Sequence, residues 1–258
     1  MLSEFLQKVA DSQKVDFGGV LTNCVELFKK TWQQGAMHVA IVMAGVIPMI
    51  ILVYGPILWW SEMRRPSYYD YYGEYTYVSN EPNVLLVILW ILVVLIVMVL
   101  VQTLSMGIAA HFFKVCRIID MDTDEPTGDY FEFFRGGNFK RLFVLALATM
   151  GISLLAIALC YLPIFYAIVP LQLMAPIFAF NPKLSVSDII KGAFKLGNKH
   201  WIYVFGFYII ASQVAQLGVI LCIVGVIFTA SIVHLPVYYF YKDTIGFDEE
   251  ETKPSMLA

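Results

Sequence analysis

The sequence predicts an all-α polytopic membrane protein with about six transmembrane helices in three hairpins, each hairpin preceded by an interfacial amphipathic helix. Of its 258 residues, 59% are hydrophobic and only 14% are charged, whereas soluble domains contain about 45–50% apolar and about 25% charged residues. A soluble fold of this length has too little interior to bury so much apolar surface. The composition therefore excludes a soluble enzyme, and the scattered basic residues exclude a nucleic-acid partner.

Long segments without any charged residue define the predicted spans, because the hydrocarbon core of a bilayer needs about 20 apolar residues of helix. These segments are Ala36–Trp60, Asn83–Phe113, Leu142–Phe180 and Trp201–Tyr241. The first two segments each predict one span. A single helix of about 40 residues would reach about 60 Å, which is twice the core thickness. The last two segments therefore each predict a hairpin, with turns near Cys160–Pro163 and Gly218–Gly225.

The distribution of lysine and arginine sets the predicted orientation, since cytoplasmic loops are enriched in these residues. With the N-terminus inside, only Arg64 and Arg65 fall on the outer side. We therefore expect a membrane protein with both termini cytoplasmic. The predicted organisation is an N-terminal segment (1–35), a membrane domain (36–245) with an outer loop (61–82) and inner loops (114–141 and 181–200), and an acidic disordered tail (246–258).

Amphipathic stretches precede the predicted hairpins. In the clearest, Ser185 and Asp188 form a capping box, and the apolar residues that follow recur at helical spacing. The apolar positions are Val186, Ile189, Ile190, Ala193 and Phe194. A similar face begins at Phe17, and a weaker copy spans 129–138. Helices of this kind lie in the headgroup layer with lysine near lipid phosphate and tryptophan at the interface. The predicted lipid contacts are Lys29, Lys30, Trp32, Lys191, Lys195, Lys199 and Trp201.

Prolines and polar side chains mark a second feature of the spans. The predicted fourth span carries Pro163, Pro170 and Pro176, which free backbone carbonyls and kink a helix. Such a helix either packs tightly on its neighbours or lines a cavity, as broken helices do in transporters. A set of polar residues in the spans either cross-links helices or lines a polar path. These residues are Gln102, Gln172, Gln213, Gln216 and His234.

The outer loop 61–82 is rich in tyrosine, which suits both a wet membrane interface and a protein contact. Its tyrosines are Tyr68, Tyr69, Tyr71, Tyr72, Tyr75 and Tyr77. The loop is either an extension of the aromatic belt or a docking patch for another protein. Membrane lipid and a protein partner, or a second copy of the chain, are thus the expected partners.

Candidate chemistry is sparse. The four histidines have no metal-ligand spacing and no carboxylate near them in the spans, so we expect neither a metal nor any other cofactor. Ser231 or Thr229 with His234 is the only possible nucleophile–base pair, and no third group orients the imidazole. Cys160 and Cys222 both fall at predicted outer turns, where a disulfide is one possibility and free thiols the other.

The last third of the chain resembles a known family. A run from Asn181 to Trp201 is followed by the pattern Gly218-x3-Cys222-x2-Gly225-x3-Thr229-x6-Pro236-x4-Tyr241-x-Asp243. This pattern is similar to a broad family of bacterial six-helix membrane proteins, which includes the membrane domain of some glycerophosphodiester phosphodiesterases. The resemblance is best over about 125–245 and implies the membrane fold, with no activity attached. It departs at Ile164, where relatives often have glycine and then a basic residue, so an anion site is not implied there.

Taken together, the sequence predicts a non-enzymatic inner-membrane protein that acts as a subunit or scaffold of a membrane complex or in lipid organisation. The alternative is a passive transporter of lipid or small molecules, with the proline-broken fourth span and Gln213 and Gln216 around its site.

Overall fold

The computed structural model describes residues 1–63, 83–159, 162–220 and 223–247, and these residues form helices and connecting turns without any strand. Within them, five helices are long and apolar enough to cross a membrane. They are α2 (Phe17–Met63), α3 (Val84–Asp120), α4 (Asn138–Ala158), α5 (Leu162–Phe180) and α7 (Trp201–Ile220). The prediction of an all-α polytopic protein is confirmed.

The sixth predicted span is helical but broken. It consists of α8 (Ile223–Thr229), the 3-10 helix η2 (Ala230–His234) and α9 (Leu235–Thr244) in series. Pro236 lies in the first turn of α9, where its missing N–H costs no hydrogen bond. The proline therefore starts a new helix after η2 and does not continue the preceding one.

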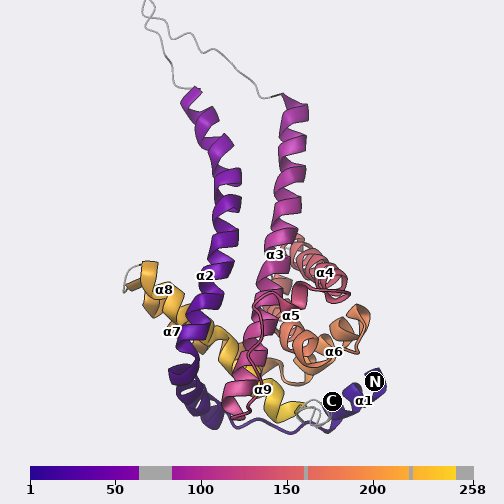
Figure 1. Cartoon of the computed structure of the whole chain (residues 1–258). Helices are drawn as coiled ribbons and strands as arrows, with labels where there is room; N and C mark the ends of the chain where they lie inside the picture. The colour runs from indigo at the N-terminus through magenta and orange to yellow at the C-terminus, as the bar shows by residue number, and fades with distance from the viewer. Residues whose placement is uncertain (64–82, 160–161, 221–222, 248–258) are drawn as a thin grey trace, which may run out of the picture.

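Helices α2 and α3 form an antiparallel pair that extends well beyond the other described helices (Figure 1). The expected boundary at residue 35 is not a helix end, because the amphipathic stretch from Phe17 and the first span form one continuous helix. Gly35 lies where α2 meets η2, and a Cβ atom at this position would be 2.3 Å from the Ser231 hydroxyl oxygen. Only glycine permits this close approach of the two elements.

The amphipathic helix α6 (Val186–Lys199) begins as predicted, since the Ser185 hydroxyl accepts a hydrogen bond from the Asp188 backbone N–H. Its apolar face does not point toward lipid, however. Ile189, Ala193 and Leu196 are fully buried in the core of the protein, where α6 packs on α5 and on α1 (Leu2–Asp11). The expectation that this face lies on the membrane is therefore wrong.

The third amphipathic copy, 129–138, reduces to the short 3-10 helix η1 (Glu132–Phe134). Gly136 has a φ of +62°, a backbone conformation that favours glycine. This residue interrupts the helical path before α4 begins at Asn138.

Helix α9 is fastened to the end of α3 by a cluster of hydrogen bonds on one carboxylate. Asp120 accepts hydrogen bonds from the hydroxyls of Tyr238 (2.9 Å) and Tyr239 (2.7 Å) and from the Lys242 ammonium group (2.5 Å). Both tyrosine side chains are buried. These contacts fix the broken last segment against α3 and so hold η2, with His234 at its end, in place.

Candidate binding cavity

A cavity of about 340 Å³ lies between α3, α4, α5 and η2. Its polar lining residues are Gln102, Ser105, Thr149, Ser153, Gln172 and His234. Met106, Ala109, Ile164, Ile168, Leu171 and Ala175 supply the apolar lining. Its volume falls at the lower end of the range of about 300–1,000 Å³ that is typical of small-molecule sites.

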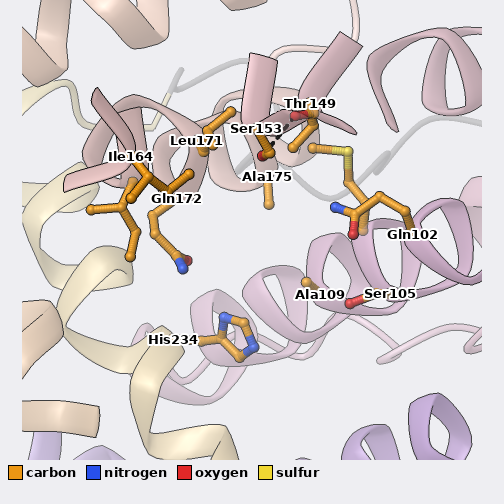
Figure 2. A pocket seen from close by; sticks show the side chains of 12 residues that line it. Gln102, Ser105, Ala109, Thr149, Ser153, Ile164, Leu171, Gln172, Ala175 and His234 are labelled. Atoms are coloured by element: carbon orange, nitrogen blue, oxygen red, sulfur yellow. Dashed lines mark hydrogen bonds between the residues drawn. The ribbon is translucent and has the colours of Figure 1, made fainter. Parts of the chain in front are cut away.

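Three of the polar side chains predicted from the sequence point into this cavity from different elements (Figure 2). Gln102 comes from α3, Gln172 from α5 and His234 from the end of η2. Among the described residues, none of these three side chains forms a hydrogen bond with the protein. Each therefore has its hydrogen-bonding groups directed at the cavity.

Pro170 and Pro176 lie on either side of Gln172 in α5 and each removes one helical N–H donor. Pro170 has no N–H to donate to the Tyr166 carbonyl, and this carbonyl accepts instead from the Trp201 indole N–H at 3.3 Å. Pro176 likewise leaves the carbonyl of Gln172 without its helical donor. Helix α5 nevertheless runs without a break from Leu162 to Phe180, so the expectation that the prolines break the fourth span is wrong. They leave two carbonyls without helical donors beside a polar cavity residue.

Thr149 and Ser153 are cavity residues that the sequence analysis missed. Their hydroxyl groups donate to the carbonyls of Leu145 (2.8 Å) and Thr149 (2.9 Å) within α4, so each hydroxyl oxygen keeps a lone pair for an acceptor role. The signal was present in the sequence, because two hydroxyl residues four positions apart share one face of an otherwise apolar helix.

Gln213 and Gln216 do not belong to this site. Both are exposed on α7, and neither lines the cavity. The expectation that they surround a site together with the proline-broken helix is therefore wrong. Their spacing places them on one helix face, but that face points away from the bundle.

The residues considered for catalysis do not form a reactive pair. The Ser231 hydroxyl is buried, and among the described residues it has no hydrogen-bond partner, so His234 does not activate it. Thr229 donates its hydroxyl to the Ala215 carbonyl at 2.8 Å. The His234 ring instead contacts the rings of Phe112 and Phe113, and its polar edge is left to the cavity.

Lys199, predicted to contact lipid, binds the C-terminal end of α1. Its ammonium group donates to the carbonyls of Val9 (2.9 Å), Ala10 (2.6 Å) and Ser12 (2.7 Å). The neighbouring His200 ring lies 2.8 Å from the Ser12 hydroxyl. The prediction for Lys199 is therefore corrected, because cations favour the C-terminal end of a helix.

The other residues predicted to contact lipid are exposed or partly exposed. Lys29, Lys30, Lys191 and Lys195 are exposed, and Lys29 pairs with Glu26 at 2.7 Å. Trp32 is 40% exposed beside Phe228, whereas Trp201 stacks on Phe205 at a ring separation of 4.5 Å. Their exposure is compatible with contact to lipid head groups, and this interfacial role stays a prediction.

Several predicted features lie outside the described residues. They are Tyr68, Tyr69, Tyr71, Tyr72, Tyr75, Tyr77, Cys160, Cys222 and the tail from 248. In the part of the chain that is described, no group of three or more His, Cys, Asp or Glu side chains is placed to hold a metal ion.

Comparison with known protein families, curated proteins and solved structures finds no match to this chain. The resemblance to the six-helix membrane family therefore stays a prediction.

Proposed function

We propose that this chain is a non-enzymatic integral membrane protein that takes an uncharged small molecule or lipid head group into its cavity, as a passive transporter or carrier would. The observation that carries the proposal is the convergence of Gln102, Gln172 and His234 on one space without protein hydrogen bonds. All three residues are partly exposed, and each would lose about 1–3 kcal/mol if the space beside it offered no hydrogen-bond partner. The cavity is therefore expected to hold water or a polar ligand.

The lining selects the chemistry of this ligand. No Asp, Glu, Lys or Arg lines the cavity, so a charged ligand would be desolvated without a counter-charge, which is strongly unfavourable. Each glutamine amide both donates and accepts, and a neutral imidazole does the same. Such groups suit hydroxyl, amide or carbonyl functions, as in a polyol or the glyceryl part of a lipid.

Native mass spectrometry of the full chain in mild detergent tests the proposal. The wild-type protein should carry a bound uncharged molecule that Gln172→Leu loses, because leucine keeps the side-chain size and removes the hydrogen bonds. Gln213→Leu is the matched control, since this glutamine is exposed outside the cavity. A wild-type protein without bound molecule, or equal retention by Gln172→Leu, would refute the proposal.

A second candidate function is a subunit or scaffold of a membrane complex. It is favoured by the part of the α2–α3 pair that extends beyond the other described helices (Figure 1). Apolar side chains late in α2 and early in α3 are widely exposed, with Ile51 at 65%, Leu58 at 62% and Leu86 at 63%. Photo-crosslinking from position 51 should capture a partner helix if this function is correct, whereas crosslinks to lipid alone would contradict it.

We also propose location in a bacterial inner membrane with both termini cytoplasmic. Helices α1, α6 and α9 lie at the same end of the structure (Figure 1), which supports a common side for the lysine-rich segments. Labelling with an impermeant amine reagent from each side of the membrane should place Lys29, Lys140 and Lys199 together. Reaction of one of them from the opposite side would contradict this orientation.

A further inference from the structure

Two histidines far apart in the sequence form a direct buried contact where α2 meets α3. The Nε2 atom of His38 lies 2.7 Å from the Nδ1 atom of His111, across a sequence separation of 73 residues. The outer nitrogens face backbone carbonyl oxygens. His38 Nδ1 lies 2.5 Å from the backbone oxygen of Gln34, and His111 Nε2 lies 3.0 Å from the backbone oxygen of Thr127. Both side chains are buried, at 4% and 1% exposure.

The three contacts of the pair require three N–H protons. A carbonyl oxygen only accepts hydrogen bonds, so both outer nitrogens must carry a hydrogen. Two neutral imidazoles have one N–H each, so their inner nitrogens would then face each other as lone pairs across 2.7 Å. A third proton between the inner nitrogens satisfies every contact, and it gives the pair one positive charge.

The short separation selects a proton over a metal ion as the bridge. Zinc binds each imidazole nitrogen at about 2.0–2.1 Å, so at a tetrahedral angle it would hold two nitrogens about 3.3 Å apart. The observed 2.7 Å is shorter than this and matches the donor–acceptor distance of a hydrogen bond.

The charged and titratable groups around the pair include two carboxylates and one lysine. They are Lys114, Asp129, Tyr130, Glu132 and His234. Lys114 is paired with one oxygen of Glu132 at 2.7 Å, while the other carboxylate oxygen is buried without a hydrogen-bond partner in the described part of the chain. Asp129 is paired with Arg135. The Tyr130 ring packs at an angle against both imidazoles, and its hydroxyl donates to the Gln34 side chain at 3.0 Å.

We propose that the His38–His111 pair is a proton-binding site that takes up one proton as a unit. The bound proton completes the chain of hydrogen bonds from Gln34 on α2, through both rings, to Thr127 in the turn after α3. When the proton leaves, one of the two outer carbonyls loses its donor. The shorter outer contact, between His38 and the Gln34 carbonyl, keeps its hydrogen, so the Thr127 carbonyl is the one that loses its donor. Thr127 lies outside any helix, so segment 121–131 loosens, and proton binding links pH to the packing of this segment on α2 and α3. The proposal does not depend on the function of the cavity.

Histidine NMR on the full chain in lipid nanodiscs tests this proposal, because the protein has only four histidines. With 15N-labelled histidine, nitrogen–nitrogen coupling through the hydrogen bond identifies the pair in the wild-type protein without any variant. At pH 5 the pair should show three N–H protons, shared over two rings that titrate together. Two N–H protons, four N–H protons, or rings that titrate independently in the folded protein would overturn the proposal.

Hydrogen exchange provides a second test, because a histidine with only a structural role would not make the exchange rate depend on pH. After correction for intrinsic rates, proton uptake should slow exchange over 121–131 about fivefold, the effect of one typical hydrogen bond. His111→Gln should abolish this pH dependence, and His200→Gln, which changes a histidine outside the pair, should retain it. Equal pH dependence in wild type and His111→Gln would contradict the link.

Discussion

Replacing Lys199 with methionine should release α1 from α6 while the remainder of the chain stays folded. The methionine keeps most of the apolar stem of lysine but cannot donate to the three carbonyls at the end of α1. Phe5 and Val9 still hold α1 by burial, at 4% and 1% exposure. The substitution therefore removes the polar part of the attachment and leaves the apolar part intact.

The size of the effect follows from the three hydrogen bonds. Bonds to a charged group contribute about 1.5–3 kcal/mol each, but one ammonium makes all three, and it regains water when α1 detaches. We therefore expect a total of about 2 kcal/mol, which increases the detached fraction of α1 about 30-fold. Hydrogen exchange by mass spectrometry should show this increase over residues 2–11 and little change in α3.

Lys195→Met provides the matched control, because Lys195 is exposed on the same helix one turn earlier and makes no such contact with α1. Its exchange over residues 2–11 should equal that of the wild type. If Lys199→Met also matches the wild type, or if both variants loosen α1 equally, then Lys199 does not hold this helix and the assignment fails.

Two further predictions concern Asp120 and His200. Asp120→Ala leaves the donors of Tyr238 and Lys242 without their acceptor, so it should lower the free energy of unfolding by about 2–4 kcal/mol. Hydrogen exchange in α9 should become faster, and unchanged exchange would contradict this prediction. Burial, aided by the adjacent lysine charge, lowers the pKa of His200, so the detached form binds a proton more readily. Protection of residues 2–11 from hydrogen exchange should be complete above the ordinary histidine pKa of about 6.5 and should decrease as the pH falls below it. His200→Gln should remove this pH dependence. Unchanged protection down to pH 5 in the wild type would refute the prediction.

The fold could be predicted where the evidence in the sequence is local. Uncharged segments of span length predict α2, α3, α4, α5 and α7, and a serine with an aspartate three residues later predicts the start of α6. Helix α1 could have been predicted too, because Leu2, Phe5, Leu6 and Val9 recur at helical spacing. The break in the last segment coincides with Pro236, which lies in the first turn of α9, a position that proline favours.

The candidate sites depend on contacts that sequence spacing does not encode. Gln102 and Gln172 meet only because α3 packs beside α5, whereas Gln213 and Gln216 share a face that turns outward. His38 and His111 show no local spacing at all, so their contact is invisible until α2 and α3 are paired. Lys199 was ambiguous for another reason, because a lysine at a helix end suits a lipid phosphate and a helix C-terminus equally well.

A crystal structure of the full chain grown from a lipidic phase is the most direct test of the binding cavity. Non-protein density should lie within hydrogen-bonding distance of Gln102, Gln172 and His234, and it should have the form of ordered water or an uncharged molecule. If these side chains instead bond to one another across a closed and dry interior, the cavity does not exist in the membrane and the proposed function fails with it.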